Sequence, residues 1–167
     1  MRASPWSSAD KERELKIAVL GAGALGCAMG SCLCEAGHEV WLINRNANHV
    51  DAMNRDGLTV RIQCADRQIR VRAACHAQDI AAQSGPVDLV IVLVKSFHTR
   101  EAISSATAIV GPRTVVLSLQ NGLGHEDVLA EVVGREKVVA GKTYAGGVML
   151  GPGHIIRGTE GKETHIG

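Results

Sequence analysis

The amino-acid sequence predicts an α/β fold, with a doubly wound, mostly parallel sheet that carries helices on both faces. Two observations lead to this prediction. Short apolar runs alternate along the chain with stretches whose apolar residues recur at helical spacing. In addition, the run VDLVIVLV at residues 87–94 is apolar almost throughout and rich in β-branched residues. Such a run is typical of a strand that is buried on both faces of a parallel sheet.

The first half of the chain predicts alternating strands and helices. From Ala24 the apolar residues recur at helical spacing, and Gly37 follows where a helix end favours a left-handed residue. Gly57 closes a second, shorter helical stretch. Beyond it, apolar and polar residues alternate as in half-exposed antiparallel strands. We therefore predict helices at 24–36 and 47–56, and strands at 17–20, 38–44, 58–63 and 67–73.

The second half of the chain predicts further alternating strands and helices, followed by a segment rich in glycine. We expect strands at 87–94 and 114–119, and helices at 99–109 and 125–133. From Lys137, glycines separate short apolar runs, which indicates a C-terminal segment of antiparallel strands without a further helix. Ligands of doubly wound folds bind at the carboxyl ends of the strands. One crevice should therefore be bordered by the loops after Leu20, Ile43, Val94 and Leu117.

Composition excludes several classes of protein. The formal net charge is only +1, which argues against a dedicated binder of nucleic acid or of an anionic membrane surface. The longest aliphatic run, at 89–94, is about a third of the length that a transmembrane helix needs. Residues 1–15 lack the apolar segment of a secretory signal. We expect them to form a disordered tail before one domain at 16–167, in a cytoplasmic protein.

The cysteines and histidines predict neither a disulfide framework nor a metal site. The five cysteines are an odd number without a CxxC pair, and the seven histidines are scattered without metal-ligand spacing. Reduced thiols are the simpler interpretation. We expect no bound metal.

The segment GAGALG at 21–26 has the GxGxxG spacing of a dinucleotide-binding turn. Its first glycine would allow a tight turn, its second would let the backbone approach a pyrophosphate, and its third would let the helix pack close to the strand. The helix start offers N–H groups and a partial positive charge. A purely structural glycine-rich turn is the alternative. We predict a Rossmann-type cofactor site made by Gly21, Ala22, Gly23, Ala24, Leu25 and Gly26.

The end of the second strand favours NADP(H). An NAD site usually has an acidic residue about twenty residues after the glycines, where it bonds the ribose hydroxyls. Here the sequence is Asn44, Arg45, Asn46, without a carboxylate. An arginine can pair with the 2′-phosphate of NADP(H). Arg45 is therefore the predicted partner of that phosphate, with a solvated strand-end arginine as the alternative.

Two polar residues follow the next two strands of the predicted sheet. Lys95 in VKSFHT and Asn121 in SLQNGLG stand at carboxyl ends, beside the nicotinamide half of the expected crevice. A lysine and an amide there could orient or polarise a carbonyl substrate. A solvated lysine and an ordinary Asn-Gly turn are the alternatives. We predict both residues as catalytic positioning residues on the cofactor side.

Four segments occur in the order in which they stand in ketopantoate reductases, namely KIAVLGAGALG, VKSFHT, SLQNGLG and the closing GPGHIIRG…THIG. From Lys16 to Gly167 the chain resembles this family, which is also called 2-dehydropantoate 2-reductase. The resemblance implies NADPH-dependent reduction of 2-dehydropantoate, a small 2-keto acid, to pantoate on the route to pantothenate and coenzyme A. It also implies the pyrophosphate at the three glycines, the 2′-phosphate at Arg45, and the nicotinamide and keto group beside Lys95 and Asn121.

The resemblance is incomplete in one respect. The family has a helical C-terminal domain with a catalytic lysine, the proposed general acid, and no residue here matches that lysine. We therefore expect this chain to bind NADP(H) and to turn over keto acids poorly by itself. A related hydroxy acid dehydrogenase with another substrate and a non-catalytic NADPH-binding module are the alternatives. We expect no nucleic-acid or membrane partner, and a homodimer stays open.

Overall fold

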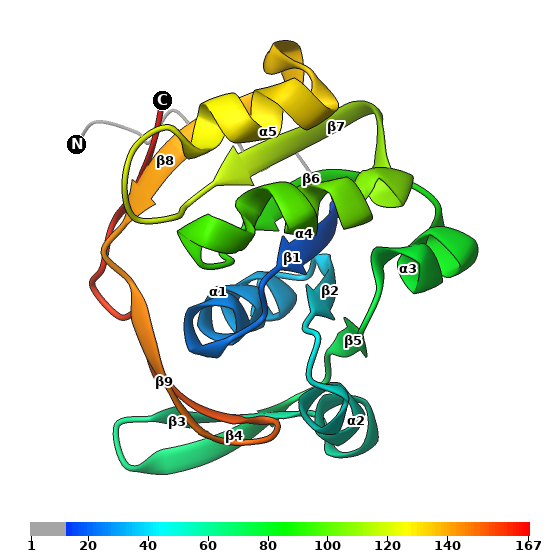
Figure 1. Cartoon of the computed structure of the whole chain (residues 1–167). Helices are drawn as coiled ribbons and strands as arrows, with labels where there is room; N and C mark the ends of the chain where they lie inside the picture. The colour runs from blue at the N-terminus through cyan, green and yellow to red at the C-terminus, as the bar shows by residue number, and fades with distance from the viewer. Residues whose placement is uncertain (1–12) are drawn as a thin grey trace, which may run out of the picture.

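The computed structural model describes residues 13–167 and contains two sheets with helix α1 (Ala24–Glu35) between them (Figure 1). Of the tail predicted at 1–15, residues 1–12 lie outside the described part. Neighbouring strands of the larger sheet are parallel, except for β11 against β8. Its seven strands are, in order across the sheet, β11 (Thr164–Ile166), β8 (Val138–Thr143), β7 (Val110–Ser118), β6 (Val87–Val92), β1 (Lys16–Leu20), β2 (Glu39–Ile43) and β5 (Arg72–Ala74).

Helices cover both faces of the larger sheet. Along β1, Ile17 and Val19 belong to one buried apolar cluster and Ala18 and Leu20 to another, because successive residues of a strand point to opposite faces. The first cluster contains residues of α1 and the second contains none of them. The predicted doubly wound α/β fold is confirmed. The other helices are α2 (Ala47–Asp56) on the α1 side, and α3 (Ala77–Ser84), α4 (Thr99–Ser105) and α5 (His125–Val133) on the opposite side (Figure 1).

The smaller sheet joins the middle of the chain to its C-terminal part. Its strand order is β4 (Ala65–Ile69), β3 (Leu58–Ile62), β10 (His154–Gly158) and β9 (Gly146–Gly151). The pairs β3–β4 and β9–β10 are antiparallel, as the sequence predicts for both regions. Strand β10 is parallel to β3, and this pairing connects the two hairpins into one sheet. After the 3₁₀ turn η3 (Arg135–Lys137), the described residues contain no further helix, which agrees with the prediction.

One prediction of local structure is wrong, and one helix is missing from the predicted elements. The strand predicted at 67–73 is two strands, because β4 pairs with β3 in the smaller sheet while β5 pairs with β2 in the larger one. Helix α3 was not among the predicted elements. Its short sequence, AQDIAAQS, buries only Ala77 and Ile80, so it offers a weak helical pattern.

The helix predicted at 99–109 ends early, at Ser105. There the Ser105 hydroxyl donates to the carbonyl oxygen of Ala102, and the Thr107 hydroxyl donates to that of Ser104. Such side-chain bonds compete with helical backbone bonds. The 3₁₀ turn η2 (Thr107–Ile109) completes the segment. Strand boundaries differ most at the end of β6, which is Val92 and not residue 94, and at the start of β7, which is Val110 and not residue 114.

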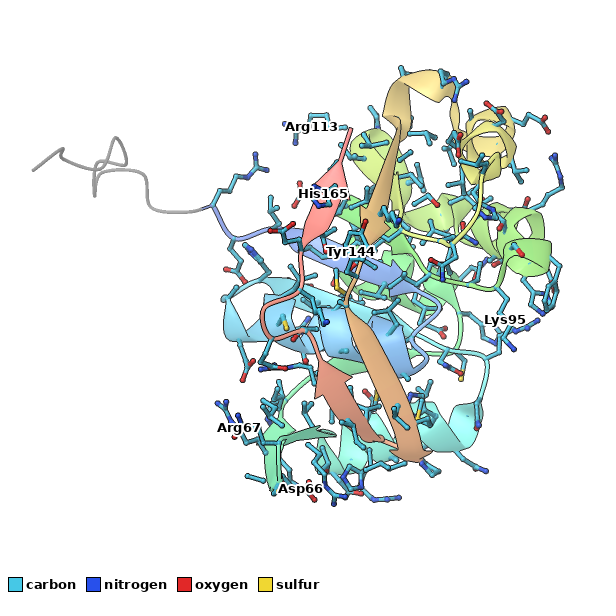
Figure 2. All side chains as sticks on the ribbon, turned by 90° about the vertical axis from the view of Figure 1, so that its left-hand side faces the viewer. Asp66, Arg67, Lys95, Arg113, Tyr144 and His165 are labelled. Atoms are coloured by element: carbon cyan, nitrogen blue, oxygen red, sulfur yellow. The ribbon has the colours of Figure 1, made fainter. Side chains whose placement is uncertain are left out.

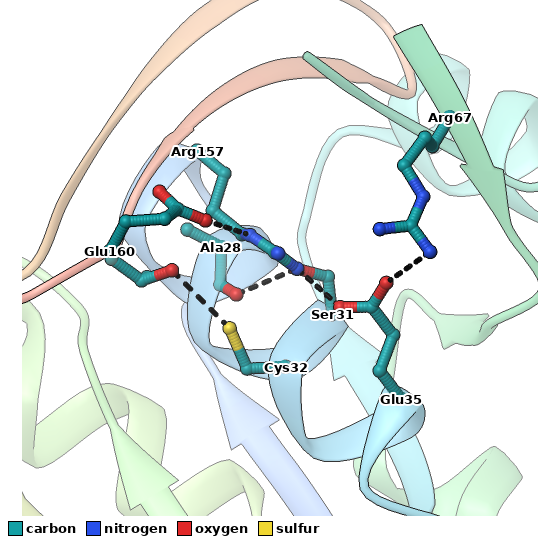
Figure 3. Close-up of polar contacts among 8 residues, drawn as sticks. Ala28, Ser31, Cys32, Glu35, Arg67, Arg157 and Glu160 are labelled. Atoms are coloured by element: carbon teal, nitrogen blue, oxygen red, sulfur yellow. Dashed lines mark hydrogen bonds and ion pairs between the residues drawn. The ribbon is translucent and has the colours of Figure 1, made fainter. Parts of the chain in front are cut away.

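An ion-pair cluster fastens the smaller sheet to α1 (Figure 3). The side chain of Arg157, on β10, is only 9% exposed, and its Nη1 contacts one carboxylate oxygen of Glu35 at the end of α1. The other oxygen of Glu35 lies 3.2 Å from Nη2 of Arg67 on β4. The Nε atom of Arg157 lies 3.1 Å from the carboxylate of Glu160. A guanidinium so deeply buried requires such partners, and they join β4, β10 and α1.

Strand β9 crosses α1 with almost no space between the two backbones. A Cβ atom on Gly147 would lie 2.6 Å from the carbonyl oxygen of Ala24, at the first residue of α1. The neighbouring residue on the strand, Gly146, has nothing within 4 Å of the same position. The absence of a side chain is therefore required at Gly147 and not at Gly146.

We predict that Gly147→Ala destabilises the fold by about 1–3 kcal/mol, because the backbone of β9 or of α1 must shift to admit the methyl group. Gly146→Ala is the matched control, and it should leave stability unchanged or raise it slightly. Urea unfolding followed by circular dichroism measures both variants. Equal stabilities would show that β9 does not press on α1.

Candidate functional site

The loops after four strands meet at one edge of the larger sheet. Strands β1, β2, β6 and β7 are parallel to their neighbours, so their carboxyl ends lie at the same edge. In the strand order β7, β6, β1, β2, these ends are followed by Asn121, Lys95, the glycine turn at 21–26, and Arg45. The sequence-predicted site residues therefore share one edge of the molecule.

Glycine is required at two positions of the turn. Gly21 has a φ of +103°, and a Cβ atom there would lie 2.6 Å from the backbone nitrogen of Val94 in the loop after β6. A Cβ atom on Gly26 would collide with the carbonyl oxygen of Gly21. Gly23 is different, because nothing lies within 4 Å of its Cβ position. The turn is thus tightly packed on its inner side and open at Gly23.

Helix α1 begins with backbone N–H groups that have no acceptor among the described residues. Its first hydrogen bond runs from the N–H of Cys27 to the carbonyl oxygen of Gly23, over 2.8 Å. Within residues 13–167, no acceptor contacts the N–H groups of Ala24, Leu25 or Gly26. The first turn of α1 also carries no acidic side chain. Free N–H groups beside an open glycine, at the positive end of a helix dipole, suit an anion.

Ala22 has a different place from the other turn residues. Its side chain is buried, and its N–H donates to the carbonyl oxygen of Ile43 over 2.8 Å. Its own carbonyl oxygen accepts from Nδ2 of Asn44 at 2.8 Å, and Nε2 of His49 on α2 lies 3.1 Å away. Ala22 therefore anchors the turn to the end of β2 and to α2.

His49 connects the glycine turn to the smaller sheet. Its Nδ1 accepts the N–H of Gly153, between β9 and β10, over 2.9 Å. Because Nδ1 is an acceptor, Nε2 carries the proton and donates to Ala22, so the imidazole is neutral. The sequence offers no signal for this link, since Ala22 is 27 residues from His49 and Gly153 is 104 residues away. No spacing rule relates residues so far apart.

Lys95 and Asn121 line one open hollow of about 350 Å³ together with Leu25, from the first turn of α1. Figure 2 shows Lys95 on the loop after β6, well away from Asp66 and Arg67 of the smaller sheet. Both Lys95 and Asn121 are exposed. The structure thus brings these two polar side chains to the helix start that follows the glycines.

A buried network holds the loops that carry Lys95 and Asn121. Nε2 of Gln120 donates to the carbonyl oxygen of Val94 and to the hydroxyl of Thr99, each over 2.8 Å. These bonds cross from the loop after β7 to the loop after β6. Gln120 therefore ties together the two loops that carry Lys95 and Asn121.

Asn121 also borders a second, larger hollow of about 560 Å³. This hollow extends over the start of α5 to β8 and β11. Its lining includes exposed apolar groups, with Leu123 at 96% and Ile166 at 61% exposure, and the cationic Lys142. Figure 2 shows Tyr144 and His165 close together on this side of the molecule, and their rings pack edge to face with centroids 6.1 Å apart. Asn121 thus stands between two concave surfaces.

Arg45 lies outside both hollows, at the end of β2. Its Nη2 lies 3.3 Å from Nε2 of His98, and its Nη1 lies 3.7 Å from the carboxylate of Glu101 on α4. The structure therefore groups Arg45 with the start of α4, while Lys95 and Asn121 are grouped with the start of α1.

A doubly wound sheet with a glycine turn between its first strand and first helix defines a Rossmann-type α/β domain. Comparison with known families gives a narrower assignment. The family described as ketopantoate reductase PanE/ApbA matches residues 17–167. The chain belongs to the ketopantoate reductase family, which is a family of oxidoreductases.

Two of the individual relatives agree with this assignment, and a third is a dehydrogenase with another name. The 2-dehydropantoate 2-reductase of Pyrococcus abyssi is 38% identical over 153 residues, which are 92% of this chain and 47% of the relative. The PanE/ApbA family ketopantoate reductase from Ralstonia eutropha JMP134 has 38% identity and a TM-score of 0.77, over 86% of this chain and 46% of that one. D-mandelate dehydrogenase, solved with NADH and anilino(oxo)acetate, has 28% identity and a TM-score of 0.83, over 91% and 48% of the two chains.

Two facts follow from these relatives. A structural relative of the chain binds a nicotinamide cofactor. The chain spans about half the length of the curated relatives that it matches.

The residues that the structure describes form no helix long and apolar enough to cross a membrane, and no group of His, Cys, Asp or Glu among them could hold a metal ion.

Burial lowers the pKa of His49 below its ordinary value of 6.5, and its hydrogen bond to Ala22 opposes this shift only in part. Protonation would place a charge in the core and would remove the acceptor for Gly153. The neighbouring thiol of Cys27 lies 3.4 Å from Nε2 of His49, and burial raises the pKa of this thiol to about 12. Cys27 therefore stays neutral, and His49 is the titrating group of the link.

We predict that stability falls as the pH drops below about 6.5, because the unfolded chain then binds a proton at His49 that the folded protein binds only at lower pH. His49→Gln keeps a donor and an acceptor but cannot titrate, so its stability should fall less between about pH 7 and pH 5. Urea unfolding at several pH values measures this difference. Parallel pH profiles for the two proteins would contradict it.

Proposed function

We propose that this chain forms the NADP(H)-binding part of an enzyme that reduces 2-dehydropantoate, a 2-keto acid, to pantoate on the route to pantothenate and coenzyme A. One observation carries the proposal. The turn at 21–26 presents the open Gly23 and the free N–H groups of α1 beside a hollow lined by Lys95 and Asn121. Membership of the ketopantoate reductase family supports the choice of reaction.

The residues of the turn fit a dinucleotide. The open position at Gly23 leaves room for pyrophosphate oxygens against the backbone. The N–H groups of Ala24, Leu25 and Gly26 are donors for those oxygens. Gly21 and Ala22 contribute by shaping the turn. At the other end of the cofactor, the Arg45 guanidinium pairs with the 2′-phosphate.

Lys95 and Asn121 act on the nicotinamide side. When bound, the cofactor supplies a hydride for the C2 carbonyl carbon of the keto acid. The Lys95 ammonium is a charged donor and the Asn121 amide is a neutral one. Both orient the keto oxygen and stabilise the negative charge that develops on it. Gln120 keeps these donors in place by joining their loops.

The keto oxygen also requires a proton donor. No residue of this sequence matches the catalytic lysine of the family, and the chain spans about half the length of its curated relatives. We place the donor outside the 167 residues. A cytoplasmic location stays a prediction, and the oligomeric state stays open.

A related hydroxy acid dehydrogenase is the second candidate. D-mandelate dehydrogenase has a TM-score of 0.83 against this chain, compared with 0.77 for the Ralstonia eutropha reductase. Both candidate reactions transfer a hydride between the nicotinamide and the carbon atom next to a carboxylate. Measuring turnover of a panel of 2-keto acids distinguishes this candidate from ketopantoate reduction. If a full-length form binds NADPH and turns over none of them, a non-catalytic module is favoured.

We predict that the 167-residue chain binds NADPH and scarcely oxidises it in the presence of ketopantoate. The binding groups lie within the chain, whereas a missing general acid lowers the rate by about 10²–10⁴-fold. Calorimetry measures the binding, and nicotinamide absorbance measures the turnover. Turnover of an ordinary enzyme, about 1–10³ s⁻¹, would show that the chain carries its own acid. Absence of NADPH binding would contradict the proposed function.

We predict that Gly23→Val abolishes NADPH binding and leaves the fold intact. The new side chain would occupy the space left for the pyrophosphate, while no protein atom lies within 4 Å of its Cβ. Gly151→Val is the matched control, because that glycine is equally open and lies at the end of β9, in the smaller sheet. Calorimetry and circular dichroism measure the two properties. Unchanged binding by the Gly23 variant would exclude the turn as the phosphate site.

A further inference from the structure

We propose that Glu101 weakens the preference of this site for NADPH over NADH, by competing with the 2′-phosphate for Arg45. The inference rests on the proposed function, because it concerns the same cofactor. It makes Glu101, in the first turn of α4, a specificity-determining residue.

The structure supplies a carboxylate where the local sequence has none. The end of β2 reads Asn44, Arg45, Asn46, without an acidic residue. Glu101 comes from another element, and its Oε1 lies 3.7 Å from Nη1 of Arg45. The second carboxylate oxygen of Glu101 lies 3.4 Å from Nδ1 of His98. An NAD site usually has an acidic residue at the end of its second strand. In this chain Glu101 of α4 brings a carboxylate to that place.

His98 completes the cluster and orients its members. Its Nε2 lies 3.3 Å from Nη2 of Arg45. Because an arginine nitrogen can only donate, Nε2 of His98 is the acceptor, and in the neutral ring Nδ1 carries the proton toward Glu101. Each side chain of the cluster of Arg45, His98 and Glu101 therefore contacts both of the others. Arg45 is thus already paired with Glu101 when no cofactor is present.

The pairing of Glu101 with Arg45 weakens the binding of NADPH more than the binding of NADH. A 2′-phosphate must either displace the carboxylate of Glu101 from Arg45 or bind beside it, and like charges repel. NADH has a 2′-hydroxyl at that position, which can donate a hydrogen bond to a carboxylate. The side chains of Arg45 and Glu101 are 70% and 69% exposed, so solvent and salt screen the effect. We expect a change of about two- to fivefold in the ratio of the two affinities.

The experiment measures the Kd of NADPH and of NADH by calorimetry for the unmutated chain, Glu101→Gln, Arg45→Ala and the double variant. Glu131→Gln is the control, because Glu131 is also an exposed glutamate, is paired with Arg100 of α4, and loses the same charge. Glu101→Gln should raise NADPH affinity about two- to fivefold and leave NADH affinity unchanged or lower. The gain should be clearly smaller in the Arg45→Ala background, where only direct repulsion between Glu101 and the phosphate remains, and it should shrink at high salt. Glu131→Gln should change neither affinity.

Different outcomes overturn the inference and the proposed function. An unchanged NADPH/NADH ratio in Glu101→Gln, or the same gain without Arg45, overturns the inference alone. An equal gain in Glu131→Gln also overturns it, since net charge would then be the cause. If the unmutated chain binds neither cofactor, the proposed function is wrong and this inference falls with it.

Discussion

The carbonyl oxygen of Ala22 is the point on which the geometry of the candidate site depends. Asn44 ties it to the end of β2, and His49 ties it to α2. Through its second ring nitrogen, His49 also holds Gly153 in the smaller sheet. A buried acceptor with several donors has little freedom to move, because each displaced donor would lose its partner in a medium that offers no water. The glycine turn is therefore fixed from both sheets.

Buried and exposed polar residues have separate tasks in this molecule. His49 and Gln120 are buried and satisfied, and they set where the loops after β1, β6 and β7 lie. Three exposed residues lie in the loops after β6, β7 and β2, namely Lys95, Asn121 and Arg45. Rigid support beneath exposed groups is the arrangement that holds a ligand-binding side chain in one place.

Much of the fold follows from patterns that are local in sequence. The apolar run at 87–94 and the alternation of strands and helices predicted the parallel sheet, because burial on both faces leaves no polar positions in a strand. The division of 67–73 into β4 and β5 could not be predicted in this way. An alternating pattern indicates that a segment is extended and half-exposed. It does not indicate which strand, in which sheet, the segment pairs with. Helix α3 was missed because a short helix that buries two residues has almost no period to detect.

The form of the glycine turn follows from the sequence, since the positive φ of Gly21 and the close contact between Gly26 and Gly21 arise within a strand-to-helix connection of a few residues. The close approach of Val94 to Gly21 comes instead from the packing of the loop after β6. The sequence by itself also placed Arg45, Lys95 and Asn121 at one edge, because parallel strands share the direction of their carboxyl ends. Which side chains meet there depends on how the helices pack in three dimensions. Glu101 reaches Arg45, and His49 reaches Ala22, because separate elements pack against the same sheet. Contacts of this kind depend on how whole helices pack against the sheet, and the spacing of residues along the chain does not predict that packing.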